Sequence, residues 1–440
     1  MLNVYRYMFK IPDLRGKIVF TLAMFAVYRL GAAIPVPGVD LERVELLAET
    51  AEAGGIIGLL NLFSGNALES LSVFSLGILP YITASIIMQL LTVVIPRLQK
   101  LQDEGESGRK VITQWTRYTT VILALLQSTG LTWLFHNGSL TNGIDLIPNY
   151  NPPRVAMIVL TMTAGTAFIM WIGELITEKG VGNGMSLIIF ISIIAALPGQ
   201  FSTLWQFTVT NGRPVLFASM TIVFILMIVG IIYVEQGQRR IPIQFAKRIR
   251  GRRVMGGQST YIPLKVNTAG VIPVIFATSV LFFPALISTS IPSDNRFFGA
   301  IRDFINVHLV PSGHSNGGTS WIYIVLLFFL IVFFTYFYTA IQFDPVRQAE
   351  MIQRQGGFIP GQRPGQQTAR YLERILNRIT LPGSVFLGVV SILPAIASAI
   401  WAIPVGFSGV SILIVVGVAL ETMKQIESQL TMRNYEGFLT

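Results

Sequence analysis

Long apolar runs separated by short polar segments dominate the sequence. The hydrocarbon core of a bilayer is about 30 Å thick, and a helix of about 20 mostly apolar residues crosses it. By this criterion the chain has ten candidate spans, at residues 18–37, 70–95, 113–135, 154–176, 185–207, 214–234, 268–290, 319–342, 379–399 and 401–422. The pattern predicts an all-α polytopic membrane protein whose ten transmembrane helices pack as one bundle.

The first run has a basic segment before it, as a secretory signal peptide has. The run is long, contains Arg29, and ends in Pro35 and Pro37 instead of a small-residue cleavage site. We therefore expect it to be a transmembrane helix and not a cleaved signal.

The distribution of Lys and Arg predicts the orientation of the chain, because cytoplasmic loops carry the excess of positive charge. With ten spans, 26 of the 32 basic residues fall on the side of the amino terminus and five on the opposite side. Both termini are therefore expected to be cytoplasmic.

The ten spans divide into two halves of five. The first half lies within residues 1–230 and contains spans 1–5. The second half contains span 6 at 214–234 and spans 7–10 within 268–440, with long polar loops at 235–267 and 343–378. An odd number of spans in each half makes the halves enter the membrane in opposite senses, so an inverted repeat is allowed.

Composition removes several classes of function. Charged residues make up 12% of the chain, about half the usual share for a soluble protein. There is no Cys, and the three His residues lie outside the apolar runs. Disulfides and thiolate chemistry are excluded, and no nucleotide-binding glycine loop follows a strand. We expect no cofactor, no metal and no catalytic centre, which disfavours a membrane enzyme.

Charged side chains are scarce inside the spans. Ion-coupled transporters usually carry carboxylates, His or Lys there, whereas the only candidates are Arg29 and Glu174, each near a helix end. Local ion pairing or placement at a helix end is the simpler explanation for both. An ion-coupled secondary transporter of small molecules is the alternative function, and it predicts buried charge that the spans lack.

Two basic loops suggest a docking surface on the cytoplasmic side. The loop at 235–267 interleaves Arg and Lys with Ile, Phe and Tyr, and the loop at 343–378 contains Gly and Pro around Arg363. Such charges also orient the chain and attract anionic lipids, while RNA or an acidic protein surface would bind them through complementary charge. The candidate docking residues are Arg239, Arg240, Lys247, Arg248, Arg250, Arg252, Arg253 and Arg363.

A short apolar stretch at 55–65 follows an acidic segment on the opposite side. It is too short to span a bilayer and is flanked by Gly and Ser. It fits a re-entrant, plug-like helix buried in protein or, equally well, an amphipathic helix at the interface.

Several long motifs resemble those of the SecY family, the central channel subunits of the bacterial Sec translocon. They include LGILPYITASIIMQLL at 76–91, GTAFIMWIGELITEKGVGNGMSLIIF at 165–190, QRRIPIQFAKRIRGRRV at 238–254 and FIPGQRPGQQTARYL at 358–372. The resemblance covers essentially the whole chain. It implies two inverted five-helix halves around a central pore with a short plug helix.

The resemblance also implies a function and its residues. Such a channel passes unfolded secretory polypeptides across the plasma membrane and releases signal sequences and transmembrane segments sideways into lipid, driven by the SecA ATPase or the ribosome. The implied pore ring is Ile78, Ile82, Met185, Ile189, Ile275 and Ile414; the implied plug is Ile57, Leu60, Asn61, Phe63 and Gly65; the implied polar residues of the lateral gate are Thr83, Gln127 and Asn267.

The family's partners are implied in the same way. They are the small membrane subunits SecE and SecG, the SecA motor, the ribosome, signal peptides and nascent chains, in a bacterial plasma membrane. Arg363 matches an Arg of the family's docking loop, but Gln362 and Gln366 replace its usual apolar and acidic neighbours.

Overall fold

The computed structural model describes residues 11–40, 64–65, 67–68, 70–138, 145–147, 150–210, 212, 214–245, 248–250, 253–255, 259–289, 296–309, 320–401 and 408–436. Helices dominate these residues. The ten at the positions of the predicted spans are α2 Pro12–Ala33, α5 Leu79–Val94, α7 Glu106–His136, α8 Pro152–Lys179, α9 Gly184–Trp205, α10 Pro214–Gln236, α11 Ile272–Thr289, α13 Trp321–Gln342, α15 Gln366–Trp401 and α16 Gly409–Glu436. Four shorter helices, α6 Pro96–Asp103, η1 Gln206–Thr210, α12 Arg296–His308 and α14 Pro345–Arg354, join them.

Most of these helices are long and apolar enough to cross a bilayer. Among the described residues, eight helices meet that criterion, and α5 with α6 counts as a ninth although the pair bends by 100°. The remaining predicted span, at 268–290, contains a shorter apolar segment, Ile272–Leu281 of α11. The prediction of an all-α polytopic membrane protein is confirmed, while α15 begins at Gln366, well before the predicted start of its span at 379.

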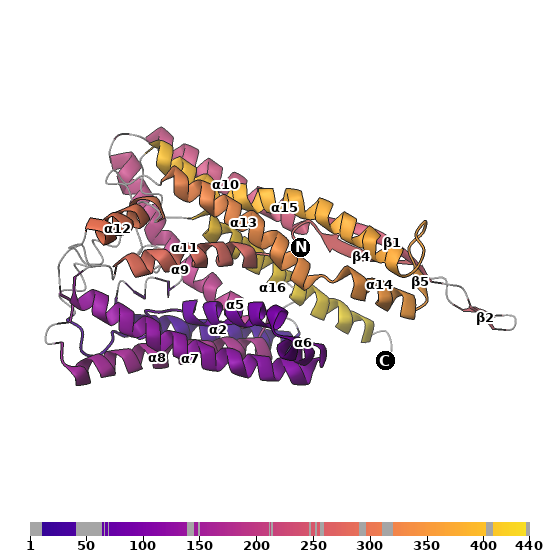
Figure 1. Ribbon diagram of the computed structural model, residues 1–440, viewed down its shortest axis with the longest axis horizontal. Coiled ribbons are helices and arrows are strands. Elements are labelled where there is room, and N and C mark those ends of the chain that lie inside the picture. Colours follow the sequence, from indigo (N-terminus) through magenta and orange to yellow (C-terminus); the bar gives the residue numbers. More distant parts are fainter. Residues whose placement is uncertain are drawn as a thin grey trace.

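The helices pack side by side along one long axis (Figure 1). Helices α2, α5, α7 and α8 form one side of the bundle, and α10, α13 and α15 form the other, with α9, α11 and α16 between them. Helix α10 shows how the outer surface meets lipid. It is apolar along its length, and its buried residues are Met220, Met227 and Ile231, a composition that suits contact with hydrocarbon.

Local sequence signals begin several helices. Proline occupies the first turn of α2, α5, α8 and α14, where its missing N–H and fixed φ cost nothing. Side chains of Asn183, Ser320 and Asp344 accept backbone N–H bonds at the starts of α9, α13 and α14, which satisfies donors that a helix leaves free.

The long loop at 235–267 is a β-hairpin. Its strands β1 Gln238–Phe245 and β4 Ser259–Lys265 pair antiparallel, and β2 Arg248–Arg250 pairs with β3 Arg253–Met255 at the tip. The second long loop adds the short strand β5 Gly357–Phe358, which pairs with Gln244 and Phe245 of β1. The two loops therefore share one three-stranded sheet, in the order β4-β1-β5.

An apolar core holds the two loops together. Ile241 and Ile243 point inward from β1 and pack against Ile352 of α14 and Leu372 of α15. Arg239 and Arg240, which precede these two residues on β1, stay exposed. We call the end of the bundle that carries β1–β5 and α14 the basic face; Figure 1 shows the hairpin extending from it beyond the helices.

Candidate functional site

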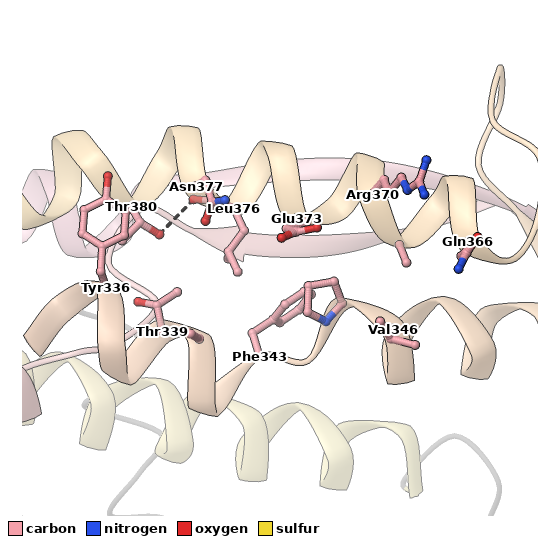
Figure 2. Close-up of a pocket in the computed structure, with 13 residues that line it drawn as sticks. Tyr336, Thr339, Phe343, Val346, Gln366, Arg370, Glu373, Leu376, Asn377 and Thr380 are labelled. Atoms are coloured by element: carbon pink, nitrogen blue, oxygen red, sulfur yellow. Dashed lines mark hydrogen bonds between the residues drawn. The ribbon is translucent and has the colours of Figure 1, made fainter. Parts of the chain in front are cut away.

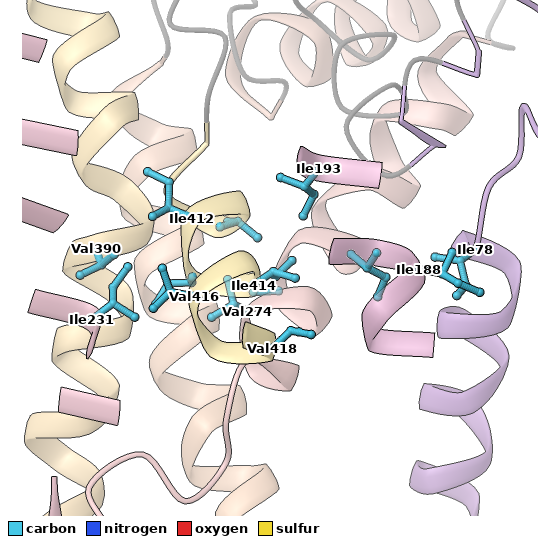
Figure 3. Close-up of a cluster of buried hydrophobic side chains, with 14 of the residues drawn as sticks. Ile78, Ile188, Ile193, Ile231, Val274, Val390, Ile412, Ile414, Val416 and Val418 are labelled. Carbon is cyan, nitrogen blue, oxygen red and sulfur yellow. The ribbon is translucent and has the colours of Figure 1, made fainter. Parts of the chain in front are cut away.

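An apolar cluster lies where helices from both sides of the bundle meet. Ile78, Ile189 and Ile414 are buried members of this cluster, with exposed fractions of 1%, 5% and 1%. Ile82, Met185 and Ile275 are partly buried and pack against it. The structure thus brings all six residues of the expected pore ring into one cluster. Figure 3 shows two of these six residues, Ile78 beside α5 and Ile414 on α16. It also shows two other cluster members, Ile188 on α9 and Val274 on α11.

Met185 differs from the isoleucines in what it contacts. A Cβ atom placed on Gly173 of α8 would lie 2.4 Å from the Met185 Sδ atom, so this side chain packs against the bare backbone of Gly173. An unbranched thioether fills such an irregular gap readily. Met185 therefore links α9 to α8 while it lines the edge of the cluster.

The end of the expected plug is bound by two helices. Of the five plug residues, Ile57, Leu60, Asn61 and Phe63 lie outside the described residues, and Gly65 lies within them. Arg29 of α2 donates a hydrogen bond from Nη1 to the Gly65 carbonyl oxygen at 3.0 Å. Arg29 therefore bonds a backbone carbonyl 36 residues along the chain, at the end of the expected plug, and not the local ionic partner that was expected.

A second contact anchors the same turn. The Tyr28 hydroxyl lies 2.6 Å from Ser192 Oγ of α9 and donates to the Ser64 carbonyl oxygen at 3.1 Å. Tyr28 is 1% exposed and stacks on Phe74 with ring centroids 5.7 Å apart. Tyr28 and Ser192 were not predicted from the sequence; the available signal was a Tyr hydroxyl inside an apolar span, which needs a partner when buried. We call Tyr28, Arg29 and Ser192 the anchor.

The three expected gate residues are held by different partners. The Thr83 hydroxyl donates to the Leu79 carbonyl oxygen of its own helix. Asn267 Nδ2 donates to Glu235 Oε1 at 2.5 Å and to the Gly270 carbonyl oxygen at 3.0 Å. Gln127 is partly exposed on α7. Asn267 Oδ1 is buried and has no hydrogen-bond partner among the described residues. The segment that leads into α11 therefore contains one buried acceptor without a donor.

Two ion pairs hold the helices near the basic face. Arg117 of α7 binds Glu174 of α8 through two hydrogen bonds, at 2.7 and 2.8 Å, which confirms the expected local pairing of Glu174. Arg347 of α14 binds Asp103 of α6 at 2.7 Å. This second pair joins residues 244 positions apart and connects the continuation of α5 to that of α13.

The expected docking residues lie at the basic face, as far as they are described. Arg239 and Arg240 are exposed on β1, and the Arg240 guanidinium lies 4.9 Å from the centroid of the Tyr261 ring. Arg248 and Arg250 lie on β2, and Arg253 begins β3. Arg363 is exposed in the turn before α15. Lys247 and Arg252 lie outside the described residues.

No cluster of three or more His, Cys, Asp or Glu side chains that could hold a metal ion occurs in the described part of the chain. The cluster at the centre of the bundle is apolar: most of its side chains are aliphatic, with Phe, Tyr and Met among them. An apolar cluster enclosed by long, lipid-facing helices is typical of the core of a polytopic membrane protein, and the fold places the chain in that class.

Comparison with known proteins identifies the kind of membrane protein. The family model for SecY matches residues 72–423. The protein translocase subunit SecY of Streptomyces coelicolor is 50% identical over 450 residues, an alignment that covers all of both chains. The chain belongs to the SecY family. It is therefore a protein-conducting channel subunit and not an enzyme, and the family assignment gives the alternative of a small-molecule transporter no support.

Solved structures agree on the fold. A structure described as a protein-conducting channel superposes with a TM-score of 0.60 at 18% identity over 96% of both chains. The channel of a ribosome–channel complex from the canine endoplasmic reticulum gives a TM-score of 0.57 at 16% identity over 96% of both chains. At this identity the likeness concerns the fold alone.

Proposed function

We propose that Ile78, Ile82, Met185, Ile189, Ile275 and Ile414 form the seal through which the translocating polypeptide passes. The observation that carries the proposal is their convergence in one apolar cluster from α5, α9, α11 and α16. A narrow apolar constriction excludes water and ions by dewetting. Side chains without hydrogen-bonding groups also offer no preferred contact to any particular polypeptide, which suits a channel with many substrates.

The plug completes this seal on the side away from the basic face. The stretch 55–65 would close the pore from that side, and the anchor would hold its carboxyl end. The contacts of Tyr28 and Arg29 to Ser64 and Gly65 support this role, because they fix the turn that leads out of the stretch.

The lateral gate lies, in this proposal, between α5 and α11, with α7 and α13 beside them. In the described part of the chain, the polar contacts across this seam include a side-chain hydrogen bond between Gln89 of α5 and Tyr338 of α13. Interhelical hydrogen bonds in membranes contribute only about 0.6 kcal/mol on average, so a seam closed mainly by apolar packing opens readily. Thr83, Gln127 and Asn267 would line it, and the unsatisfied Oδ1 of Asn267 would gain a partner when the gate rearranges.

The basic face docks the machinery that drives translocation. Arg239, Arg240, Lys247, Arg248, Arg250, Arg252, Arg253 and Arg363 would bind the SecA motor and the ribosome. The projecting hairpin supports this role, because its shape presents guanidinium groups away from the membrane, where RNA phosphates or an acidic protein surface can reach them. The canine channel with this fold was solved in a ribosome–channel complex, which supports a ribosome as one partner.

The chain would work with SecE and SecG in a bacterial plasma membrane. Both termini and the basic face would be cytoplasmic, as the distribution of Lys and Arg requires. The pore would then open between two halves that move relative to each other. The first half is residues 1–230 with spans 1–5. The second half contains span 6 and spans 7–10 within 268–440.

Polar substitution of the seal tests the proposal. We expect Ile82→Ser or Ile275→Ser to raise the ion conductance of the resting complex in planar bilayers, because a hydroxyl in the constriction favours wetting. Ile225→Ser on α10, where the side chain is 54% exposed, is the matched control and should leave conductance unchanged. Equal conductance in all three variants and the unsubstituted complex would overturn the assignment of the seal.

A further inference from the structure

The exposed side of α15 changes abruptly from basic to apolar. Arg370, Arg374 and Arg378 follow one another at intervals of four residues and are all exposed. The same side continues with Leu381, Val385 and Val389, which are 57%, 41% and 44% exposed. Intervals of three and four residues place these side chains on one face of a helix, so the boundary falls between Arg378 and Leu381.

The length of the apolar part locates that boundary in the membrane. From Leu381 to Ile400, which is 61% exposed, a helix rises about 29 Å at 1.5 Å per residue. This matches a hydrocarbon core of about 30 Å. Leu381 therefore marks the edge of the hydrocarbon on the side of the basic face.

The arginines differ in their distance from that edge. Arg378 lies about 4.5 Å and Arg374 about 10 Å beyond Leu381 along the helix. The headgroup layer is about 5–8 Å thick on each side, and a long Arg side chain reaches towards it. Arg378 and Arg374 therefore reach lipid phosphates, whereas Arg370, about 16 Å away, lies beyond them.

A shallow hollow lies beside the row of exposed arginines Arg370, Arg374 and Arg378, which we call, together with the apolar Leu381, Val385 and Val389 that continue it, the stripe. Arg370, Glu373, Arg374, Asn377, Arg378 and Leu381 line a shallow depression on the outside of α15. A cavity of about 340 Å³ lies on the adjoining side, between α15 and the α13–α14 connection. Figure 2 shows Glu373 on the side of α15 that faces Phe343, and Arg370 at the opposite edge of the helix.

We propose that this depression binds the headgroup of an anionic phospholipid. Arg374 and Arg378 bind the phosphate, Asn377 bonds a polar group of the headgroup, and the acyl chains lie along Leu381, Val385 and Val389. Each Arg near an anionic surface favours binding by about fivefold. The site is separate from the seal and from the docking residues assigned above, and it does not depend on translocation.

The geometry favours a lipid over the other phosphate-bearing ligands. Free phosphate would gain nothing from the apolar residues of the stripe. RNA would need the arginines to stand clear of the membrane, as those of the hairpin do, but Arg378 lies only one helical turn from Leu381. A lipid uses both halves of the stripe at once.

A photo-crosslinking experiment tests the site in the complete translocase complex. The photoreactive residue p-benzoylphenylalanine replaces Leu381, and the complex is reconstituted in phosphatidylcholine vesicles with a small labelled fraction of phosphatidylglycerol. We expect the fraction of lipid adducts that contain phosphatidylglycerol to exceed the mole fraction of phosphatidylglycerol in the bilayer. Arg374→Gln with Arg378→Gln should lower that excess at least about fivefold. Arg97→Gln with Arg354→Gln removes the same charge from exposed positions on α6 and α14 and should leave the excess unchanged.

Three outcomes would overturn the proposal. If phosphatidylglycerol forms adducts only in proportion to its share of the bilayer, the depression selects no lipid. A partner helix that covers the stripe would give this result. Equal excess in the double variant and the unsubstituted complex would exclude the two arginines. Loss of the excess on adding inorganic phosphate or ribosomes would show that the depression binds a soluble anion or RNA.

Discussion

The anchor gives a quantitative prediction about the resting channel. Tyr28→Phe removes one hydroxyl and keeps the ring that stacks on Phe74. Without the Tyr28 hydroxyl, the Ser192 hydroxyl still has an acceptor, because the Ile188 carbonyl oxygen lies 2.8 Å away. The substitution therefore removes the contact between α2 and Ser64 and leaves the helix packing in place.

The size of the effect follows from the bonds lost. Tyr28 donates to Ser64 at 3.1 Å and contacts Ser192 at 2.6 Å in a buried environment. Polar bonds between membrane helices are worth about 0.6 kcal/mol on average and at most about 1.7. A loss of about 1 kcal/mol changes the ratio of seated to displaced plug about fivefold.

Single-channel recording measures this ratio directly. The complete translocase complex in planar bilayers, without motor or ribosome, should show an open probability about fivefold higher for Tyr28→Phe than for the unsubstituted complex. Tyr323→Phe is the matched control, since Tyr323 is 5% exposed on α13 and lies outside the anchor. It should leave the open probability unchanged.

Two results would refute this reasoning. An unchanged open probability in Tyr28→Phe would show that the turn at Ser64 does not hold the plug. An equal rise in Tyr323→Phe would show a general loosening of the bundle. Ser192→Ala provides a second check: combined with Tyr28→Phe it should add less than its separate effect, because both changes remove the same contact.

Most spans of this chain were predictable because they are long apolar runs. A hydropathy window detects the part of a helix that meets hydrocarbon, so it missed the first turns of α15. Residues from Gln366 to Arg378 are polar on their exposed side and apolar at Leu372 and Ile375. This amphipathic pattern is typical of a helix that continues into water along a protein surface.

The hairpin carried a signal that the loop interpretation overlooked. In β1, buried Ile241 and Ile243 alternate with exposed Pro242 and Gln244, and alternation with a period of two indicates a half-buried strand. The many Arg and Lys residues around this strand led to the interpretation of the segment as a basic docking loop. The partner strand β5 consists of two residues, which is too short for any pattern to reveal.

The residues of the proposed seal could not be predicted from the sequence pattern of any single helix. Ile78 and Ile82 form an i,i+4 pair inside an apolar helix, and every face of such a helix is apolar, so spacing cannot tell pore from lipid. The resemblance to SecY supplied that assignment. The anchor and the Asp103–Arg347 pair join segments 164 and 244 residues apart, and such pairings follow only from the packing of the whole bundle.

Three further predictions concern docking, the plug and the basic face. Arg363→Glu should abolish SecA-driven translocation into vesicles but not assembly of the complex, whereas Arg354→Glu, at a side chain 82% exposed, should have little effect. Gly65→Ala should raise resting conductance more than Tyr28→Phe, because Gly65 has φ +67° and a Cβ there would lie 3.0 Å from Ser192 Cα, at a cost of about 1–2 kcal/mol for the left-handed conformation alone. Asp103→Arg should leave two guanidinium groups facing each other between α6 and α14 and so favour separation of the two sides of the bundle, seen as higher resting conductance. Adding Arg347→Asp restores opposite charges in reversed order and should return conductance to its original value; if the double variant conducts as much as Asp103→Arg alone, the pair does not hold the basic face closed.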